Sequence, residues 1–571
     1  PILDFNEDKR EILVAHDDKN PGYGHFYSPR VGNDYVLMGK KGLLGAPGEW
    51  WYEEGEKRLY AWTKEGDSPE KHRMEYKARK LTADFSGISH YEVEGITFLG
   101  GGILTDEASS YLRLSSVRVF YPYHCFLQEF SSNPVYGSVN ILGDHIALEN
   151  SELAYSSGSI VSVRGKFNRV FNCYIHDGGY AAVWTGAFSV AGYRNLISSN
   201  TICYSGRDLV TIHGIREGVL EYNDLHHSGC ITSDLGLTYG HNTDGNGTVL
   251  RYNYVHDNMA DDCAFGIYFD HLSHNFIVHD NWIENLRNDP VRFNNPGYFD
   301  QVFHNRAANA KETKTFDHAD RQDIFGMRFM DNIVNDAILY PEHADVRGNK
   351  IIPDYRLEHI PSWGRGKEAL SYEGIDLETE HPVWDKKEYP YSSHIYNGCF
   401  ECDALCGWSV AGDGKASLAE GNGWGHIPYH ATGTSFHELK LEGNTIVFQT
   451  VSGLLPGADY VASGWLKCKG SAGYFGLVLG ENQPVDLQRI QKEALAVTGD
   501  HKSMGVELSV EKTAFCKTHK ETWQRYILRF RAGEDGRAVL LFAKEGDAGE
   551  VRCDNAFLCL TGRPVPNHTG G

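Results

Sequence analysis

The feature that most constrains this chain is a motif that recurs about every 20 to 30 residues. Each copy has apolar residues, then Asn, then a β-branched or aromatic pair, then a polar turn. The clearest copies read FNRVFNCYIHDGG, RNLISSNTICYSGR, GVLEYNDLHHSG, TVLRYNYVHDNM and NFIVHDNWIENL. This period, with short strands and Gly/Asn turns, is typical of a solenoid, and the LxxLxL pattern of leucine-rich repeats is absent. We therefore predict an all-β chain in which residues 86–355 form a right-handed parallel β-helix.

The asparagines mark successive coils of this predicted solenoid. They continue after a gap that would hold two coils. The series is Asn172, Asn200, Asn223, Asn253, Asn281, Asn332 and Asn349.

A second strand lies between consecutive asparagines, and its alternation separates inward from outward side chains. The five strands read VWTG, VTIH, LTYG, IYFD and VRFN. The first inward column is predicted as Val183, Val210, Leu237, Ile267 and Val291, and the second as Thr185, Ile212, Tyr239, Phe269 and Phe293. The outward columns are then Trp184, Thr211, Thr238, Tyr268 and Arg292, and Gly186, His213, Gly240, Asp270 and Asn294. The second outward column brings a carboxylate, an imidazole and an amide onto one exposed face.

Three further segments flank the solenoid. Residues 1–85 contain a predicted hairpin, EWWYEEGEKRLYAWT, and we expect them to cap one end of the solenoid. Residues 356–391 are rich in proline and charge, which is typical of a linker or wrapping loop. Residues 392–563 alternate in short strands with turns about every ten residues, which predicts a β-sandwich.

The formal charge of −22 disfavours nucleic acid, anionic membranes and polyanionic substrates as partners. A neutral oligosaccharide or polysaccharide fits better, and the 12% aromatic content supplies flat apolar faces for sugars. No run of 18 apolar residues and no signal peptide is visible in this sequence, which begins at Pro1, so a truncated N-terminus stays open as an alternative. The oligomeric state stays open.

The 12 cysteines show no dense disulfide framework. We expect Cys125, Cys173, Cys203, Cys230 and Cys263 to be buried free thiols, and many unpaired thiols favour a reducing cytoplasm, with secretion as the alternative for a truncated chain. Cys399, Cys402 and Cys406 are closely spaced, but no second cluster completes a zinc site.

Acidic residues gather where the outward columns end. Asp270 ends a strand, where Asp is disfavoured, so a catalytic carboxylate or a structural Asn/Asp ladder is needed to explain it. Asp208, Asp234 and Asp261 occupy turns before strands, where Asp caps are common. Asp244 lies in the GHNTDGNG loop, and Asp262 comes eight residues before Asp270.

The GIYFD strand and the GEWWYEEGEKRLYAW hairpin resemble those of bacterial β-helix glycoside hydrolases, above all the family 120 β-xylosidases, and also families 136 and 141. The resemblance implies a retaining glycosidase that needs no cofactor, with Asp270 as its nucleophile. Family 120 places its acid/base Glu one coil later, where this chain has Phe293 or Asn294. The acid is therefore expected to be Asp244 or Asp262.

Other side chains near Asp270 are expected to bind substrate or to shape the site. We expect His213 and His241 to contact substrate hydroxyls, Asn294 to hydrogen-bond Asp270, and apolar walls to raise the pKa of the acid. The full predicted binding set is His213, His241, Tyr268, Arg292, Asn294 and Trp184.

Three alternatives remain open. NTDG and DDC resemble the two acidic motifs of inverting polygalacturonases, although the later motifs of that family are missing. A polysaccharide lyase would need a base and a cation, for which Arg292 and Arg287 are candidates. A solenoid that only binds or adheres to carbohydrate is the alternative outside enzymes.

The segments NGCFECDALCGW, GLLPGADYVASGWLK, ETWQRYILRF and CDNAFL resemble jelly-roll carbohydrate-binding modules. In those modules an Asp near the last strand binds structural calcium, and Asp554 stands at that position here. A plain spacer would use the same sandwich.

Overall fold

The computed structural model describes part of the chain as two compact units, Pro1–Tyr76 and Lys77–Gly571. The described residues are 2–6, 8–9, 11–14, 39–124, 138–181, 185–241, 243–270, 273–294, 297–298, 300–310, 324–325, 327–336, 344–358, 363–364, 394–395, 398, 400, 405, 407–420, 437–481, 485–496 and 506–561. In this part of the chain no helix has the length and apolar character needed to cross a membrane.

The first unit contains two antiparallel hairpins and two short 3-10 helices. Strand β1 (Ile2–Asn6) pairs with β2 (Glu11–Val14), and β3 (Trp50–Glu53) pairs with β4 (Arg58–Ala61), which confirms the predicted hairpin. The 3-10 helices are η1 (Lys41–Leu43) and η2 (Pro69–Lys71). That this unit caps the solenoid stays a prediction.

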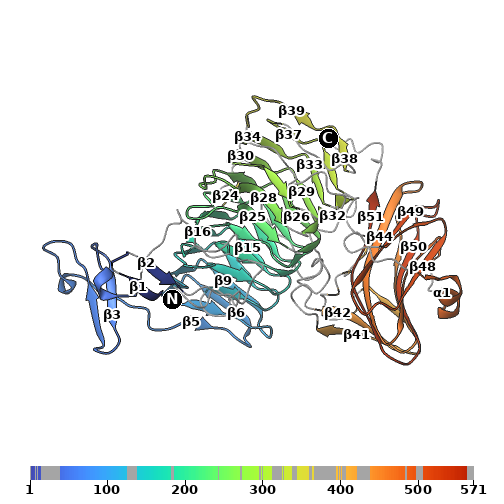
Figure 1. Cartoon of the computed structure of the whole chain (residues 1–571), viewed down its shortest axis with the longest axis horizontal. Helices are drawn as coiled ribbons and strands as arrows, with labels where there is room; N and C mark the ends of the chain where they lie inside the picture. Colours follow the sequence, from blue (N-terminus) through green and yellow to red (C-terminus); the bar gives the residue numbers. More distant parts are fainter. Residues whose placement is uncertain are drawn as a thin grey trace. The chain divides into compact units, whose positions relative to one another are not determined.

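The second unit begins with a parallel solenoid whose chain visits three sheets in turn, so the predicted all-β parallel fold is confirmed (Figure 1). Sheet 1 contains β5 (Leu81–Asp84), β8 (Gly102–Leu104), β11 (Val139–Ile141), β14 (Val161–Val163), β17 (Phe188–Val190), β21 (Val210–Thr211), β25 (Leu235–His241), β28 (Ala264–Asp270) and β31 (Val291–Phe293). Since β5 pairs with β8, solenoid pairing begins at Leu81 rather than at residue 86.

Sheets 2 and 3 complete each coil. Sheet 2 contains β6 (Ser89–Glu94), β9 (Ser110–Ser115), β12 (Ala147–Glu149), β15 (Arg169–Phe171), β19 (Leu196–Ser198), β23 (Val219–Glu221), β26 (Asp244–Arg251), β29 (His274–His279), β33 (Gln301–Phe303), β36 (Arg328–Met330) and β38 (Asp345–Arg347). Sheet 3 contains β7 (Thr97–Leu99), β10 (Arg118–Phe120), β13 (Glu152–Ala154), β16 (Tyr174–Gly178), β20 (Thr201–Ser205), β24 (Asp224–His226), β27 (Tyr254–His256), β30 (Trp282–Leu286), β34 (Arg306–Ala310), β37 (Ile333–Val334) and β39 (Lys350–Ile351). Two short parallel pairs accompany them: β18 (Gly192–Tyr193) with β22 (Ile215–Arg216), and β32 (Gly297–Tyr298) with β35 (Ile324–Phe325).

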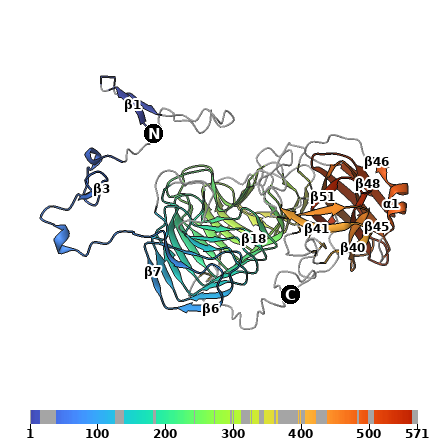
Figure 2. The same cartoon turned by 90° about the horizontal axis from the view of Figure 1, so that it is seen from below.

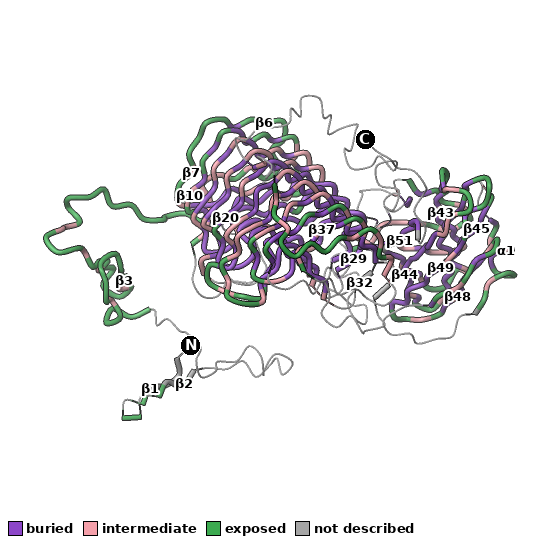
Figure 3. Tube along the Cα trace, turned by 90° about the horizontal axis from the view of Figure 1, so that it is seen from above, coloured by how far each residue is buried: buried purple, intermediate pink, exposed green. Residues whose placement is uncertain are grey.

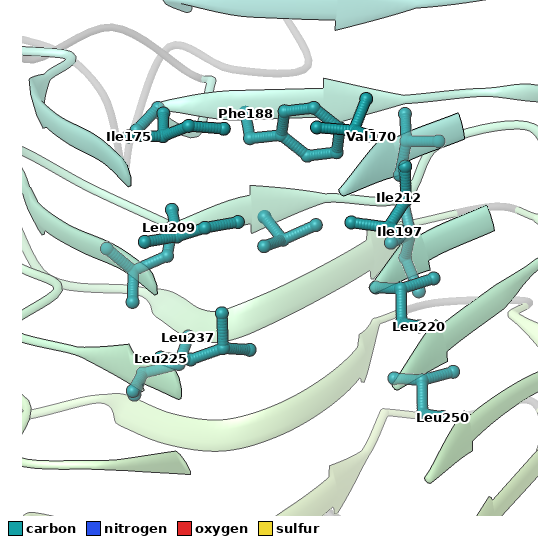
Figure 4. Packing of buried hydrophobic residues seen from close by; sticks show 14 of the residues in the cluster. Val170, Ile175, Phe188, Ile197, Leu209, Ile212, Leu220, Leu225, Leu237 and Leu250 are labelled. Atoms are coloured by element: carbon teal, nitrogen blue, oxygen red, sulfur yellow. The ribbon is translucent and has the colours of Figure 1, made fainter. Parts of the chain in front are cut away.

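The solenoid core is an apolar stack to which all three sheets contribute. In one layer Ile175, Phe188 and Val170 point toward one another, and the next coils repeat this arrangement (Figure 4). Buried residues recur in the coils between the two ends of the solenoid, whereas the end coils are more exposed (Figure 3). Removing this much apolar surface from water is the main stabilisation available to a solenoid.

A continuous asparagine ladder crosses the later coils. Along the ladder the Nδ2 of each Asn except the last donates to the Oδ1 of the Asn in the next coil, at 2.8–3.0 Å. Its members are Asn200, Asn223, Asn253, Asn281, Asn305, Asn332 and Asn349. Asn305 stands midway between Asn281 and Asn332, so the gap holds two coil steps as predicted. Asn172 lies outside the ladder, because Cys173 occupies the aligned position and donates its N–H to Asn200.

The predicted inward column is buried, but its register is wrong at one coil. Val210, Leu237, Ile267 and Val291 are at most 6% exposed in the core, and Val183 lies outside the described residues. Val210 pairs with Thr238, which pairs with Ile267. Leu237 therefore stands one position early. Leu237 and Thr238 are both buried, so burial alone does not distinguish the two registers.

The outward columns change with this register. Tyr239 pairs with Tyr268 and His241 pairs with Asp270, so Thr238 and Gly240 do not face outward as predicted and Tyr239 does not face inward. In the earlier coil the strand is Phe188–Val190, so Thr185 and Gly186 precede it.

The C-terminal part of the second unit is a β-sandwich of two six-stranded sheets, mostly antiparallel (Figure 2). One sheet has the order β40 (Ser409–Gly412), β43 (Thr445–Val451), β50 (Ala538–Glu545), β45 (Ala472–Leu479), β48 (Thr513–Thr518) and β46 (Leu495–Ala496). The other has the order β41 (Lys415–Glu420), β42 (His437–Glu442), β51 (Glu550–Thr561), β44 (Asp459–Lys469), β49 (Gln524–Arg531) and β47 (Val506–Val510). Helix α1 (Leu487–Glu493) adds Ile490 to a smaller apolar cluster on the first of these sheets.

Most of the expected linker lies outside the described residues. Trp363 and Gly364 are described, and they lie against the solenoid. The Gly364 N–H donates to the Tyr222 carbonyl at 3.0 Å, and the Trp363 ring is 5.9 Å from the ring of Tyr222. This short piece behaves as a wrapping segment.

Candidate active site

Two polar columns run across successive coils on the outward face of sheet 1. Strand pairing aligns His241 with Asp270 and Phe269 with Phe293, so Asn294 follows Asp270 in the next coil. The first column consists of Thr211, Tyr239, Tyr268 and Arg292, and the second consists of His213, His241, Asp270 and Asn294. Four of the predicted site residues, namely His213, His241, Asp270 and Asn294, therefore share one line. Coils stack about 4.8 Å apart, so neighbouring members can act together.

Asp270 is half-buried and its carboxylate receives three hydrogen bonds. The Tyr239 hydroxyl donates to Oδ2 at 2.7 Å, the Tyr268 hydroxyl donates to Oδ1 at 3.1 Å, and Asn294 Nδ2 donates to Oδ1 at 2.7 Å. Burial and the negative charge of Asp270 raise the pKa of both tyrosines well above the ordinary value. The tyrosines therefore stay protonated and act as donors that compensate the charge of Asp270.

Asp234 is the second carboxyl of this surface. It lies in the turn before β25 in the left-handed backbone region, with φ of 59°, and its side chain is 54% exposed. Burial raises the pKa of Asp234; Arg207 lowers it, and the charge of Asp270 raises it further. The two carboxyls are therefore close enough to interact. In the sequence, Asp234 carries only the signature of a turn Asp.

Arg207 and Asp208 lie beneath this surface. Arg207 is 7% exposed and Asp208 is fully buried. Arg207 Nη1 donates to Asp208 Oδ2 at 2.8 Å, and Nη2 donates to the Asp234 carbonyl oxygen. The guanidinium carbon also lies 4.6 Å from the centre of the Tyr239 ring. Burial raises the pKa of Asp208 to about 6 although Arg207 acts in the opposite direction.

The two predicted histidines lie side by side at the start of the second column. The rings of His213 and His241 are 6.1 Å apart. Burial, followed by the charges of His241 and Arg207, lowers the pKa of His213 to about 3. His213 is therefore neutral near pH 7. Its buried Nε2 has no hydrogen-bond partner among the described residues, and contact of His213 with a substrate hydroxyl stays a prediction.

Asp244 does not fit the predicted role of acid. It lies at the start of β26 in sheet 2 and is 2% exposed. Asn246 N–H and Asn275 Nδ2 donate to Oδ1 at 2.9 and 2.8 Å, and His274 lies 3.5 Å away. Burial raises the pKa of Asp244, but His274 and these hydrogen bonds together have the larger effect and lower it to about 2. An acid must hold a proton near neutral pH, so we correct this assignment.

The other alternative acid, Asp262, is exposed just before β28, and its Oδ1 accepts the Cys263 N–H at 2.7 Å. The polygalacturonase-like pairing of NTDG with DDC also loses support. Asp244 is buried on sheet 2, whereas Asp261 and Asp262 are exposed before a strand of sheet 1.

Arg292 does not fit the predicted role of a substrate ligand. It is 9% exposed, Nη1 donates to Asp289 Oδ2 at 2.8 Å, and its guanidinium lies over the Phe265 ring. Trp184 lies outside the described residues. Tyr268 contacts Asp270, and it packs with Tyr239 and Phe265 into a small apolar cluster.

A third polar column lies on sheet 3, and the geometry of the coil corners explains it. Its members are His176, Cys203, His226, His256 and Glu284, which stand in register over five coils. His176 and His256 each contact the following Asp at 2.7 Å, and His279 of sheet 2 does the same. Each of these Asp residues has positive φ at a coil corner. The repeated His–Asp contact is therefore a corner motif of the solenoid.

Eight of the cysteines lie in the described part of the chain. All eight described cysteines are free, but Cys230 is exposed and Cys263 half-exposed, against the expectation of burial. Cys125, Cys399, Cys402 and Cys406 lie outside the described residues. Asp554 is fully buried in β51, and among described residues no group of three His, Cys, Asp or Glu is arranged to hold a metal. Calcium at Asp554 stays a prediction.

No family model and no curated protein matches this sequence. Among solved structures, the bacteriophage CBA120 tailspike protein 4 enzymatically active domain is similar at 12% identity over 81% of this chain and 55% of that chain, with a TM-score of 0.23. This chain thus matches about half the length of the tailspike domain. PfbA, a surface adhesin of Streptococcus pneumoniae, is similar at 10% identity over 47% of this chain and 81% of that chain, with a TM-score of 0.34.

The carbohydrate-binding module TmCBM61, solved in complex with beta-1,4-galactotriose, is similar at 15% identity over 30% of this chain and 99% of that chain, with a TM-score of 0.21. At such identities and TM-scores these likenesses carry no information about what this chain binds. The resemblance to glycoside hydrolase families 120, 136 and 141 therefore stays a hypothesis.

Proposed function

We propose that this chain is a glycoside hydrolase that cleaves a neutral oligosaccharide or polysaccharide, with Asp270 and Asp234 as its two carboxyl groups. The observation that carries the proposal is their difference in environment. Asp270 is a strand residue held by three donors, whereas Asp234 is a more exposed carboxyl with a raised pKa. Glycoside hydrolysis uses two nearby carboxyl groups, one ionised and one protonated, and different environments produce that difference.

In the proposed mechanism Asp270 attacks the anomeric carbon and Asp234 protonates the departing oxygen. The bond from carbon to the leaving group breaks as the bond to the Asp270 oxygen forms. Water, deprotonated by Asp234, then releases the sugar with retained configuration. His213 and His241 face the same surface and are placed to bind hydroxyls of the sugar. No bound cofactor takes part in this scheme.

The alternatives have less support from the same contacts. A lyase must neutralise a uronate carboxylate with a cation. Of the two candidate cations, Arg292 is held by Asp289, and Arg287 Nε donates to the Asp261 carbonyl oxygen. A solenoid that only binds sugar gives no reason for a strand Asp that receives two tyrosine hydroxyls. A screen separates the three classes, because a binder releases no sugar and a lyase yields unsaturated products.

A panel of aryl glycosides with plant and host oligosaccharides is the first experiment. Asp270→Asn should lower turnover by about a thousandfold on whichever glycoside is turned over, and Asp234→Asn should do so on glycosides whose leaving group needs an acid, as expected for loss of a nucleophile or a general acid. Asp261→Asn, an exposed aspartate of the neighbouring turn, is the matched control and should retain activity. Unchanged turnover in Asp270→Asn would contradict the proposal.

Stereochemistry tests the retaining mechanism separately. Proton NMR of the first-formed sugar should show the anomer of the substrate, and azide should rescue Asp270→Gly as a glycosyl azide of inverted configuration. A first product of opposite configuration would instead make Asp270 a general base that activates water.

A further inference from the structure

Arg207 is buried, and it contacts the residue Asp234 directly and Asp270 through Tyr239. On one side its Nη2 donates to the main-chain oxygen of Asp234. On the other side its guanidinium lies 4.6 Å from the centre of the Tyr239 ring, and the Tyr239 hydroxyl donates to Asp270. One planar cation thus joins two consecutive coils and reaches the third, which carries Asp270, through Tyr239.

The buried carboxylate of Asp208 holds the guanidinium of Arg207 in place. Asp208 is 0% exposed and accepts from Arg207 Nη1 at 2.8 Å. Moving the guanidinium would leave a buried carboxyl without its counter-charge, which is costly in an apolar interior. A guanidinium can meet a carboxylate, a carbonyl oxygen and an aromatic face at once, whereas the ammonium of lysine is a compact point charge.

We infer that Arg207 is a positioning residue that fixes the turn bearing Asp234 relative to Asp270. This inference rests on the proposed function. Asp234 lies in a turn, and a turn is a less precise support for a catalytic group than a strand. Arg207 supplies the missing constraint by holding the main chain of that turn against the tyrosine that orients Asp270.

Leaving-group dependence tests this role, because a phenyl glycoside needs an acid and a dinitrophenyl glycoside departs without one. Arg207→Lys keeps the charge but loses the planar fork. We expect it to lower kcat/KM for the phenyl glycoside about tenfold to a hundredfold, as a misplaced acid would, and to leave kcat/KM for the dinitrophenyl glycoside within about threefold of the parent value. This ratio reports the first step and not the later attack of water that Asp234 assists. Asp234→Asn should show the same selectivity. Equal slowing of both glycosides, or of neither, would overturn the inference.

The pH profile gives a second readout. Asp234 is surrounded by charged or titratable groups on every neighbouring element, namely Arg207 and Asp208 before β21, His241 on β25, Cys263 before β28, and Asp270 on β28. The positive charge of Arg207 lowers the pKa of Asp234, so Arg207→Gln should let that pKa rise. Because the acid works in its protonated form, the alkaline limb of activity should move to higher pH in Arg207→Gln and stay unchanged in Arg207→Lys. An alkaline limb that stays in place in Arg207→Gln would contradict this inference.

Arg251→Lys is the matched control. Arg251 also donates to a buried carboxylate, Glu221 at 2.8 Å, and lies over a tyrosine ring, but it belongs to sheet 2. It should keep the activity of the parent on both glycosides. If Arg207→Lys fails to fold, Asp208→Asn serves instead, since it removes the counter-charge of Arg207. It should give a smaller loss with the same dependence on the leaving group, and equal loss on both glycosides would again overturn the inference.

The outcomes for the two proposals are distinguishable. If Asp270→Asn and Asp234→Asn keep full turnover, the proposed function fails. If those variants lose turnover as expected and Arg207→Lys shows no leaving-group dependence, only the positioning role fails.

Discussion

Aspartates of the solenoid differ in role because their surroundings differ. Asp244 is held by His274 and two amide donors, and these contacts lower its pKa to about 2. Asp300 is fully buried, and burial followed by the charge of Asp244 raises its pKa well above the ordinary value. Asp270 lies between these cases, half-buried and surrounded by donors. The residue type alone therefore does not distinguish a structural Asp from a catalytic one.

Asp300→Asn should stabilise the protein at neutral and alkaline pH. Asp300 Oδ1 accepts the Phe276 N–H at 2.8 Å, and an Asn side chain of the same shape can keep that bond. A carboxyl whose folded pKa is raised contributes stability below its unfolded value of 3.8, and this contribution is lost as the pH rises toward the folded pKa. Asn has no such titration. The melting temperature of Asp300→Asn minus that of the parent should be larger at pH 8 than at pH 4.5; an equal difference at both values would contradict this.

At the scale of the element, strand length marks the site. In sheet 1, β21 has two residues and β31 has three, whereas β25 and β28 have seven each. The longer pairing continues as far as His241 and Asp270. Main-chain hydrogen bonds therefore fix the end of the strand where the proposed nucleophile stands, which suits a group that must keep its geometry.

The asparagine ladder is the element that should be most sensitive to single substitutions. Asn253→Ala removes a side chain that accepts from Asn223 and donates to the Leu220 carbonyl at 2.9 Å and to Asn281 at 3.0 Å. Because its buried partners are left without hydrogen bonds, we expect a loss of about 3 kcal/mol or more of unfolding free energy in denaturant titrations.

The same substitution at the end of the ladder is the control. Asn349 is half-buried, so water can replace part of its bonding, and Asn349→Ala should cost about 1 kcal/mol. Equal losses at Asn253 and Asn349 would show that the ladder adds nothing beyond local hydrogen bonds.

The repeat predicted the fold well because each coil carries its own signals. The parallel solenoid, the N-terminal hairpin, the sandwich and the line of His213, Asp270 and Asn294 all follow from alternation and spacing. The register near Leu237 could not be predicted, because Leu237 and Thr238 are both buried and alternation does not separate them. Asp234 carries only the signature of a turn Asp, and the sequence around Asp244 does not reveal that it begins a buried strand of sheet 2.

At the scale of the whole molecule, the solenoid and the sandwich have separate apolar cores. The solenoid core runs from Val93 to Val334, and the main sandwich core runs from Ile395 to Leu560. Arg328 of β36 donates to the Leu560 carbonyl of β51 at 2.7 Å, so a described contact also joins the two parts. Each core is large enough to support cooperative folding on its own.

The last prediction concerns the sandwich alone. Residues 392–563, expressed by themselves, should melt in one cooperative transition, because both of their six-stranded sheets contribute to one closed core. Two readings of their function then separate in affinity electrophoresis on immobilised polysaccharides. A carbohydrate-binding module should be retarded by at least one neutral polysaccharide, and added calcium should raise its melting temperature if Asp554 helps to hold the ion. If no polysaccharide retards it while it remains folded, the spacer interpretation stands. If it melts without cooperativity, the sandwich depends on the solenoid, and the contact between Arg328 and Leu560 becomes the first place to look for that dependence.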